Sequence, residues 1–352
     1  MTNAGSRLPI ALPTLLVGSV PLADPAAVFR VAAQTLGSTI SRLPDGETGR
    51  RSNWIAWQRA VFAAVPQLVQ SETRERDYQL FPPYVLRPDA QLGDLQFGSL
   101  GFADEAIASW QVLERLRASG EVSPQVRLQV ALPTAWAPVY SFIGYRWQCE
   151  IHPIYEAALL AELARITEAI PHEALSIQWD VATEMSWWEH VYPAPFQEVE
   201  TGVLNSVAAL LNAVPAGVEL GLHLCYGSMN NRHWKEPANT ANLVAVANGI
   251  VSRLKRPLDF VHLPVPQNRH DPEYFAPLNA LRLESRCELF LGLLHLDDGV
   301  DGALRRIEAA RPYRSRFGIA CEGGLGRRPP ESIEQWLRLH ADVAHRAATQ
   351  SD

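Results

Sequence analysis

The chain has 352 residues, and its 31 Lys and Arg side chains against 38 Asp and Glu give a formal charge of −7. This acidic balance excludes a dedicated nucleic-acid-binding protein, which needs a basic surface to neutralise phosphates. Hydrophobic residues make up 47% of the sequence and charged residues 20%, a composition typical of a globular protein and not of a disordered chain.

The four cysteines are too few and too widely spread for a disulfide framework, so the expected location is the reducing cytoplasm. Residues 8–23 are free of charge, as in a secretion signal, but Pro9 and Pro13 interrupt the apolar run. Residues 14–20 in this segment are more typical of a buried strand. No stretch approaches the roughly 20 apolar residues of a membrane span, and no membrane partner is expected.

Short apolar runs alternate with longer amphipathic stretches along the chain. Eight apolar runs predict strands, at residues 14–20, 38–43, 127–132, 175–181, 218–225, 258–265, 288–296 and 316–321. Their lack of polar alternation is typical of strands covered on both faces, as in a parallel sheet. Amphipathic stretches predict helices at 24–37, 103–120, 153–170, 195–214, 239–254, 300–310 and 329–348. The first of these begins after Asp24, a suitable N-cap, and ends at Gly37.

This alternation predicts a single (β/α)₈ barrel domain over residues 1–352, with an open doubly wound sheet as the alternative. One segment exceeds a minimal barrel. Residues 44–101 lie between the second strand and its returning helix, and they are rich in Pro, Gly and aromatic residues. Loops this long are usually functional or mobile. Because the segment follows a strand, we expect an insertion on the rim of the barrel that carries catalytic groups.

Catalytic side chains of such barrels come from the carboxyl ends of the strands. The polar residues at the predicted strand ends are therefore the candidates for a functional site. In chain order they are Ser19; Asp45, Glu47, Arg50 and Arg51; Thr134, Trp136 and Tyr140; Asp180 and Glu184; His223 and Cys225; His262; His295, Asp297 and Asp298; and Cys321 and Glu322.

The pattern His223-x-Cys225 indicates a metal site. Residues two apart in a strand point to the same face, so imidazole and thiolate can reach one point in the barrel mouth. Zinc takes about four N, S or O ligands, and His262 at a later strand end is a third. Either Cys321 or Glu322 closes the coordination sphere. In the alternative interpretation, His223 and Cys225 are ordinary buried residues with structural roles.

Charged residues at two other strand ends indicate substrate binding. Arg50 and Arg51 lie close to Glu47, and paired arginines bind a carboxylate well through bidentate hydrogen bonds. A solvated turn is the structural alternative for this segment. Asp180 ends a strand beside Trp179, where an unpaired charge is costly, so we expect it to bind a cationic group or a partner side chain.

Five motifs occur in a familiar order: GSVP (18–21), LPDGExxR (43–50), IQWD (177–180), HLCY (223–226) and GGLGRR (323–328). Together they resemble the C-terminal catalytic barrel of cobalamin-independent methionine synthase, which shares a superfamily with uroporphyrinogen decarboxylase. The resemblance covers about residues 12–348, and this chain has no counterpart of the synthase's N-terminal barrel. It implies a zinc-bound thiol that is alkylated by a methyl donor.

The resemblance also implies roles for the metal-site residues by position. His223 and Cys225 match the H-x-C zinc ligands of the family. His262 stands where the family has a Glu ligand. The family's last ligand, a Cys, falls at Gly323, with Cys321 and Glu322 just upstream.

Further matches concern the substrates. Three residues match positions that hold the carboxylate and amine of an amino acid, namely Ser19, Glu47 and Asp180. Arg50 and Glu184 join them as expected substrate-binding residues. The family's catalytic His falls near Asp297, with His295 two residues before it. Tyr140 falls near an aromatic residue that stacks on the folate.

The predicted function is a zinc-dependent methyl- or alkyltransferase that acts on a small thiol through its thiolate. Asp297 or His295 would handle the proton of the leaving group. The expected partners are a small-molecule thiol and an alkyl donor, without nucleic acid or membrane. Two alternatives stay open. One is a metal-free lyase or decarboxylase that uses Arg50, Arg51 and Asp180 on a carboxylated substrate, and the other is a binding barrel without chemistry.

Overall fold

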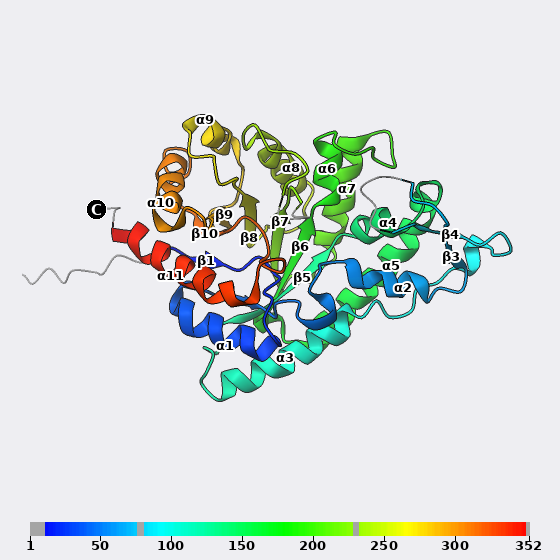
Figure 1. Ribbon diagram of the computed structural model, residues 1–352, viewed down its shortest axis with the longest axis horizontal. Helices are drawn as coiled ribbons and strands as arrows, with labels where there is room; N and C mark the ends of the chain where they lie inside the picture. Colours follow the sequence, from blue (N-terminus) through cyan, green and yellow to red (C-terminus); the bar gives the residue numbers. More distant parts are fainter. Residues whose placement is uncertain (1–10, 76–80, 228–231, 350–352) are drawn as a thin grey trace, which may run out of the picture.

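The computed structural model describes residues 11–75, 81–227 and 232–349, so Pro9 lies outside it. Eight parallel strands run through the centre of the molecule in the order β1-β10-β9-β8-β7-β6-β5-β2 (Figure 1). They are β1 (Thr14–Leu15), β2 (Arg42–Pro44), β5 (Arg127–Pro133), β6 (Leu175–Val181), β7 (Glu219–Leu224), β8 (Phe260–Pro264), β9 (Glu288–Leu294) and β10 (Gly318–Cys321). Isolated bridges between Thr14 and Ile40 and between Ser19 and Gly46 join β1 to β2. The predicted barrel is confirmed.

Helices surround these strands (Figure 1). The long ones are α1 (Pro25–Leu36), α3 (Phe102–Ala118), α5 (Gln148–Ala169), α7 (Val199–Asn212), α8 (Ala241–Val251), α10 (Gly299–Ala310) and α11 (Ile333–Thr349). Asp24 caps α1 by accepting a hydrogen bond from the Ala27 N–H at 2.8 Å, as predicted. The described residues contain no helix that is long and apolar enough to cross a membrane.

Helix α5 begins at Gln148, ahead of its predicted start at residue 153, and Pro153 therefore lies inside the helix. Proline removes one backbone hydrogen bond from a helix. Ile151 and Tyr155 on either side of it are buried, and this packing offsets the lost bond. Short helices α4 (Trp136–Phe142), α6 (Thr183–Trp188) and α9 (Pro272–Phe275) follow strand ends at the rim. The hydrophobic pattern did not predict these helices of one to two turns.

The insertion between β2 and α3 holds the short helix α2 (Arg59–Ala63) and an antiparallel pair, β3 (Leu68–Gln70) with β4 (Tyr84–Leu86). In Figure 1 this pair lies at the right-hand edge, far from α10 and α11. The buried Glu162 of α5 anchors the end of the insertion. Its carboxylate accepts hydrogen bonds from the N–H groups of Leu100 and Ala103, at 3.0 and 2.6 Å, and so caps the start of α3. The long insertion expected after the second strand is present, and its predicted catalytic role stays a prediction.

Strand β1 is much shorter than the predicted run 14–20, and side-chain amides replace part of its ladder. The carbonyls of Leu16 and Val17 accept hydrogen bonds from the Gln129 side chain, at 2.9 and 3.1 Å. Gln178 donates to the Val17 carbonyl at 2.7 Å. Buried carbonyls need such partners. A small apolar cluster fills the barrel nearby and consists of Leu15, Val17, Phe260, Phe290 and Ala320.

Arg42 closes the amino-terminal end of the barrel beneath this cluster. Its guanidinium forms a bidentate ion pair with Glu219 of β7, with both N–O distances 2.9 Å, and a second pair with Glu288 of β9 at 2.6 Å. It lies 4.5 Å from the centre of the Phe260 ring. Only 2% of the Arg42 side chain is exposed. One cation therefore ties β2 to β7 and β9 across the barrel.

Replacing Arg42 with Met leaves the Glu219 and Glu288 carboxylates without their shared cation. We expect a loss of about 3 kcal/mol in the free energy of unfolding, the lower range for breaking a buried ion pair. Chemical denaturation measures it. The control is Arg30→Met, which removes an ion pair between exposed side chains and should leave the transition near that of the wild type. Equal effects of the two substitutions would contradict the role given to Arg42.

Candidate functional site

Three polar residues lie side by side inside the barrel. Asp180 of β6 pairs in register with His223 of β7, which pairs in register with His262 of β8. His223 Nδ1 is 2.7 Å from His262 Nδ1, and His262 Nε2 is 3.0 Å from the carbonyl oxygen of Cys321. Burial lowers the pKa of His262 to about 3 and that of His223 well below its usual range. Both imidazoles are therefore neutral at pH 7.

Cys225 extends the same strand. Its N–H donates to the Val181 carbonyl at 3.0 Å, which continues the pairing of β7 with β6. Its Sγ accepts a hydrogen bond from the Gly227 N–H at 3.3 Å. Burial raises the pKa of the Cys225 thiol to about 12, and the charges of Asp180 and Glu322 add to this. The side chain is a thiol at neutral pH until a cation approaches it.

An acidic side of the mouth is formed by Asp180 and Glu47. Burial raises the pKa of Asp180 well above its usual range, as does the nearby Glu47 carboxylate. Burial also raises the pKa of Glu47 to about 7, although a hydrogen bond from the Ser19 hydroxyl and the charge of Arg51 oppose this. The structure thus brings together Ser19, Glu47 and Asp180, the residues matched to amino-acid binding. Their predicted role stays a prediction.

A glycine fixes this side of the mouth. Gly46 has φ +81°, and a Cβ there would lie 2.8 Å from the Val20 carbonyl oxygen and 2.7 Å from a Val28 methyl carbon. Only glycine allows the backbone to pass so close in this conformation. The Val20 N–H donates to the Gly46 carbonyl at 2.8 Å and joins the ends of β1 and β2. Ser19 and Glu47 meet because of this junction.

The two arginines of the same loop do not face the mouth together. Arg50 is 62% exposed and binds Glu105 of α3 at 2.9 Å. The Arg51 side chain is 11% exposed and binds Asp45 at 2.7 Å. Each guanidinium already has a carboxylate partner within the chain. The metal-free lyase or decarboxylase therefore finds no support in the geometry of Arg50 and Arg51.

Glu184 lies on α6, fully buried. Neither of its carboxylate oxygens has a hydrogen-bond partner among the described residues. Burial raises the pKa of Glu184 to about 7, and the hydroxyl of Thr134 partly opposes it. Unpaired buried carboxyl groups are rare and mark functional positions or strain. Tyr140 lies on α4, packs edge-on against Trp187 of α6 and donates a hydrogen bond to the Pro193 carbonyl at 3.1 Å.

The residues after β9 have distinct surroundings. His295 is buried, and its Nε2 is 2.8 Å from the Val265 carbonyl oxygen, so Nε2 carries the proton and Nδ1 the lone pair. Burial lowers the pKa of His295, which keeps it neutral. Asp297 is exposed. Asp298 binds Arg306 at 2.6 Å and is a structural residue. His295 is thus better placed than Asp297 for proton transfer inside the barrel.

The residues at the end of β10 point in different directions. Cys321 Sγ is 3.6 Å from Nε2 of His340 on α11, so the thiol faces the surrounding helix and not the barrel axis. Glu322 lies 3.0 Å from Nε2 of His233, in the loop that follows β7. Burial lowers the pKa of His233, but Glu322 and Glu236 outweigh it and raise that pKa to about 9. Only Glu322 therefore lies at the mouth.

The five expected metal ligands are not assembled into one site. Within the described ranges, no three His, Cys, Asp or Glu side chains are arranged to hold a metal ion. His223 and His262 bond to each other, Cys321 contacts α11, and Glu322 contacts His233. His223, Cys225 and Glu322 remain as donors at the mouth.

Three neighbours of the site were not among the expected site residues. Arg327 places a positive charge near Glu47 and Cys225 and lowers the pKa that burial raises in each. Trp54, from the insertion, lowers the pKa of Asp180 through a side-chain hydrogen bond and so opposes the effect of burial. His233 binds Glu322. No sequence motif marks Trp54 or His233, because both come from loops whose path depends on the folded barrel.

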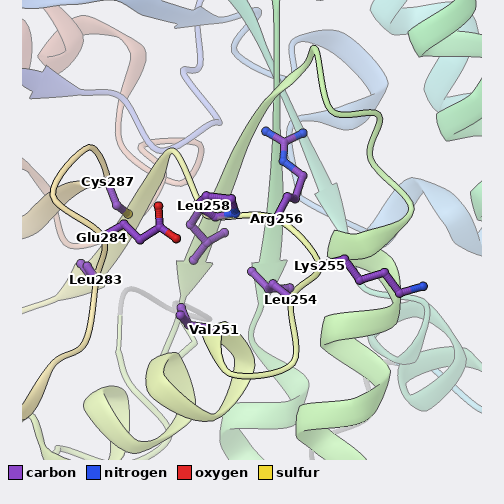
Figure 2. A pocket seen from close by; sticks show the side chains of 9 residues that line it. Val251, Leu254, Lys255, Arg256, Leu258, Leu283, Glu284 and Cys287 are labelled. Carbon is purple, nitrogen blue, oxygen red and sulfur yellow. The ribbon is translucent and has the colours of Figure 1, made fainter.

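Two hollows flank the barrel. One of about 620 Å³ lies at the rim between the loops after β1, β2 and β10, with Thr48, Gly326 and Arg327 in its wall. The other, of about 170 Å³, lies at the amino ends of β8 and β9. Figure 2 shows Cys287 and Glu284 on one side of it and Lys255 pointing away from them. This second hollow is opposite the mouth, and that end of a barrel serves stability.

No protein-family model and no curated protein matches the sequence. Solved structures match over nearly its whole length. A putative vitamin-B12-independent methionine synthase from Listeria monocytogenes has a TM-score of 0.59 at 14% identity, over 96% of this chain and 98% of that one. A B12-independent methionine synthase from Shewanella sp. W3-18-1, in complex with selenomethionine, has 0.66 at 14%, over 97% and 98%. A methyltransferase from Methanosarcina mazei has 0.55 at 13%, over 97% and 95%.

At such identities the likeness shows the fold. The chain has the barrel of methionine synthase-like and methyltransferase structures, and the resemblance predicted from its motifs is confirmed at that level.

Substituting Gln for Glu184 tests the burial of its carboxyl group. The folded pKa of about 7 exceeds the ordinary value of 4.5, so the folded state binds more protons between these values. Wild-type stability therefore falls as pH rises through this window. Glu184→Gln has no such pH dependence. Between pH 4 and pH 9, the free energy of unfolding of the wild type should therefore fall by about 3 kcal/mol more than that of the variant. Denaturation at both pH values measures it. A pH-independent difference would contradict the assigned burial.

Proposed function

We propose that the protein is a zinc-dependent methyl- or alkyltransferase that acts on a small thiol. The observation that carries this proposal is the end of β7, where His223 pairs in register with Asp180 and Cys225 follows two residues further along the chain. His223 Nε2 has no hydrogen bond to any described residue. A nitrogen and a sulfur donor two residues apart on one strand suit zinc.

The donors at the mouth are not gathered into a metal site among the described residues, so zinc binding would require three of them to move together. His223, Cys225 and Glu322 would hold the metal and leave a fourth position for the substrate sulfur, as in catalytic zinc sites. Cys321 is left out because its thiol faces α11. His262 is left out because both of its ring nitrogens already have hydrogen-bond partners. This set drops two of the five expected ligands and keeps His223 and Cys225, the pair that the H-x-C pattern predicted.

Zinc would supply ionisation of the substrate thiol at neutral pH. Asp180 and Glu47 would bind the cationic end of the thiol substrate, because an approaching ammonium group favours the ionised form of both carboxyl groups. A new bond forms between the sulfur and the alkyl carbon while the bond from that carbon to the donor breaks. The Nδ1 lone pair of His295 would take up the proton released by the thiol and pass it to the departing group. The barrel holds both reactants in line, which gains from proximity.

The partners of this reaction are small molecules, a thiol and an alkyl donor, without nucleic acid or membrane. The four cysteines are free in the structure. A reducing cytoplasm is consistent with such thiols and is the location we propose.

Metal analysis of the purified protein tests the proposal. We expect stoichiometric zinc in the wild type and in Cys321→Ser, whose thiol lies outside the site. His223→Ala and Cys225→Ser should weaken zinc binding by more than the roughly 10–100-fold typical when a residue that only orients a ligand is lost. Alkyl transfer to a panel of thiols should fall in parallel.

The matched control is Cys287→Ser, at the opposite end of the barrel, which should bind zinc as the wild type does. Two results count against the proposal: full thiol alkylation by zinc-free protein, or loss of zinc in Cys321→Ser with retention in Cys225→Ser.

A further inference from the structure

Two hydrogen bonds connect three barrel strands through His262. Its Nε2 meets the Cys321 carbonyl oxygen of β10 at 3.0 Å, and its Nδ1 meets Nδ1 of His223 on β7 at 2.7 Å. The two rings are tilted by 43°, with centres 4.8 Å apart. His262 is fully buried and His223 is 4% exposed. His262, which stands where the similar family has a Glu ligand, therefore bonds to two other strands through its two ring nitrogens.

The proton positions follow from these contacts. A carbonyl oxygen only accepts, so His262 Nε2 carries a proton. A neutral imidazole has one N–H, and His262 Nδ1 must then present its lone pair. His223 can meet that lone pair only by donating from its own Nδ1. The remaining nitrogen of neutral His223, Nε2, is left with a lone pair.

A local feature of β9 makes the first contact possible. The register between β10 and β9 shifts after Ile319, which pairs with Leu291, so that Cys321 pairs with Leu294. At the shift stands Gly292, where a Cβ would lie 2.8 Å from Glu322 Cα and 3.1 Å from the Cys321 carbonyl oxygen. The absence of a side chain lets the end of β10 lean across β9. The Cys321 carbonyl thereby reaches His262 on β8.

We propose that His262 is a positioning residue, which holds His223 in the tautomer whose Nε2 is a lone-pair donor. The order of the relay is Cys321 carbonyl, His262 and then His223. Metal-binding histidines commonly have the other ring nitrogen fixed in this way, which sets tautomer and ring orientation. The use of the Nε2 lone pair as a zinc ligand rests on the proposed function, whereas the proton positions do not.

Nitrogen NMR of metal-free protein labelled at histidine tests the proton positions. Protonated and unprotonated ring nitrogens have well-separated resonances, and the His262→Asn spectrum identifies the signals of His262. We expect His262 with a protonated Nε2 and His223 with a protonated Nδ1. Either residue in the opposite tautomer overturns the proposal, and this measurement needs only the wild-type fold.

Zinc affinity, measured by competition with a coloured chelator, separates positioning from ligation. His262→Asn keeps an acceptor oxygen for the His223 N–H, whereas His262→Leu has none. We expect the Leu variant to bind zinc about 10–100-fold more weakly than the wild type and the Asn variant to recover most of that loss. His345→Asn, at an exposed position, is the control and should be unchanged.

The outcomes distinguish the two proposals. Equal and complete loss of zinc in both His262 variants would mean that His262 is itself a ligand, and would overturn the positioning role while leaving a zinc enzyme. Wild-type affinity in His262→Leu would overturn it as well. The expected tautomers in a protein that binds no zinc would support the relay and refute the proposed function.

Discussion

A hydrogen bond between two buried imidazoles restricts everything around it. The Nδ1 atoms of His223 and His262 are 2.7 Å apart, so one proton lies between them, and burial keeps both rings neutral by lowering both pKa values. The bond in turn requires strands β7 and β8 to be in register and the Cys321 carbonyl to reach across β9. Of the acidic groups of the mouth, Asp180 on β6 pairs in register with His223, and Glu47 lies in the loop after β2. The site thus combines neutral imidazoles with carboxyl groups whose pKa values are raised by burial.

Sequence patterns predicted the eight strands because buried parallel strands are apolar on both faces, and every predicted run overlaps a strand of the barrel. The ends of strands and helices were less predictable where side chains form the hydrogen bonds that backbone groups would otherwise form. Gln129 and Gln178 satisfy the carbonyls of Leu16 and Val17, so β1 ends at Leu15 although the apolar run continues. Similarly, packing of Ile151 and Tyr155 carries α5 through Pro153. Both effects depend on residues distant in the chain or on tertiary contacts.

The candidate site was predictable at the level of strand ends and less so at the level of side-chain direction. Asp180, His223 and Cys225 lie at the mouth because alternation along a strand fixes which face each occupies, whereas Ser19 and Glu47 are brought there by the junction at Gly46. Cys321 and Glu322 are neighbours and face opposite ways, so the sequence alone left the choice between them open. Arg50 and Arg51 were expected to face a substrate, but Glu105 and Asp45 bind them. Such pairing depends on which helix packs beside the loop, and no local motif encodes it.

The ion pairs of Arg42 determine from which end of the barrel a substrate can reach the site. The ion pairs with Glu219 and Glu288, and the Phe260 and Phe290 rings above them, block the barrel axis from below. Whatever reaches the histidine layer must arrive and depart at the carboxyl-terminal rim. In the proposed reaction, both substrates would enter and both products would leave through the carboxyl-terminal end of the barrel. The substrate that binds deeper would then bind first, and its product would leave last. A closed amino-terminal end therefore favours an ordered sequential mechanism.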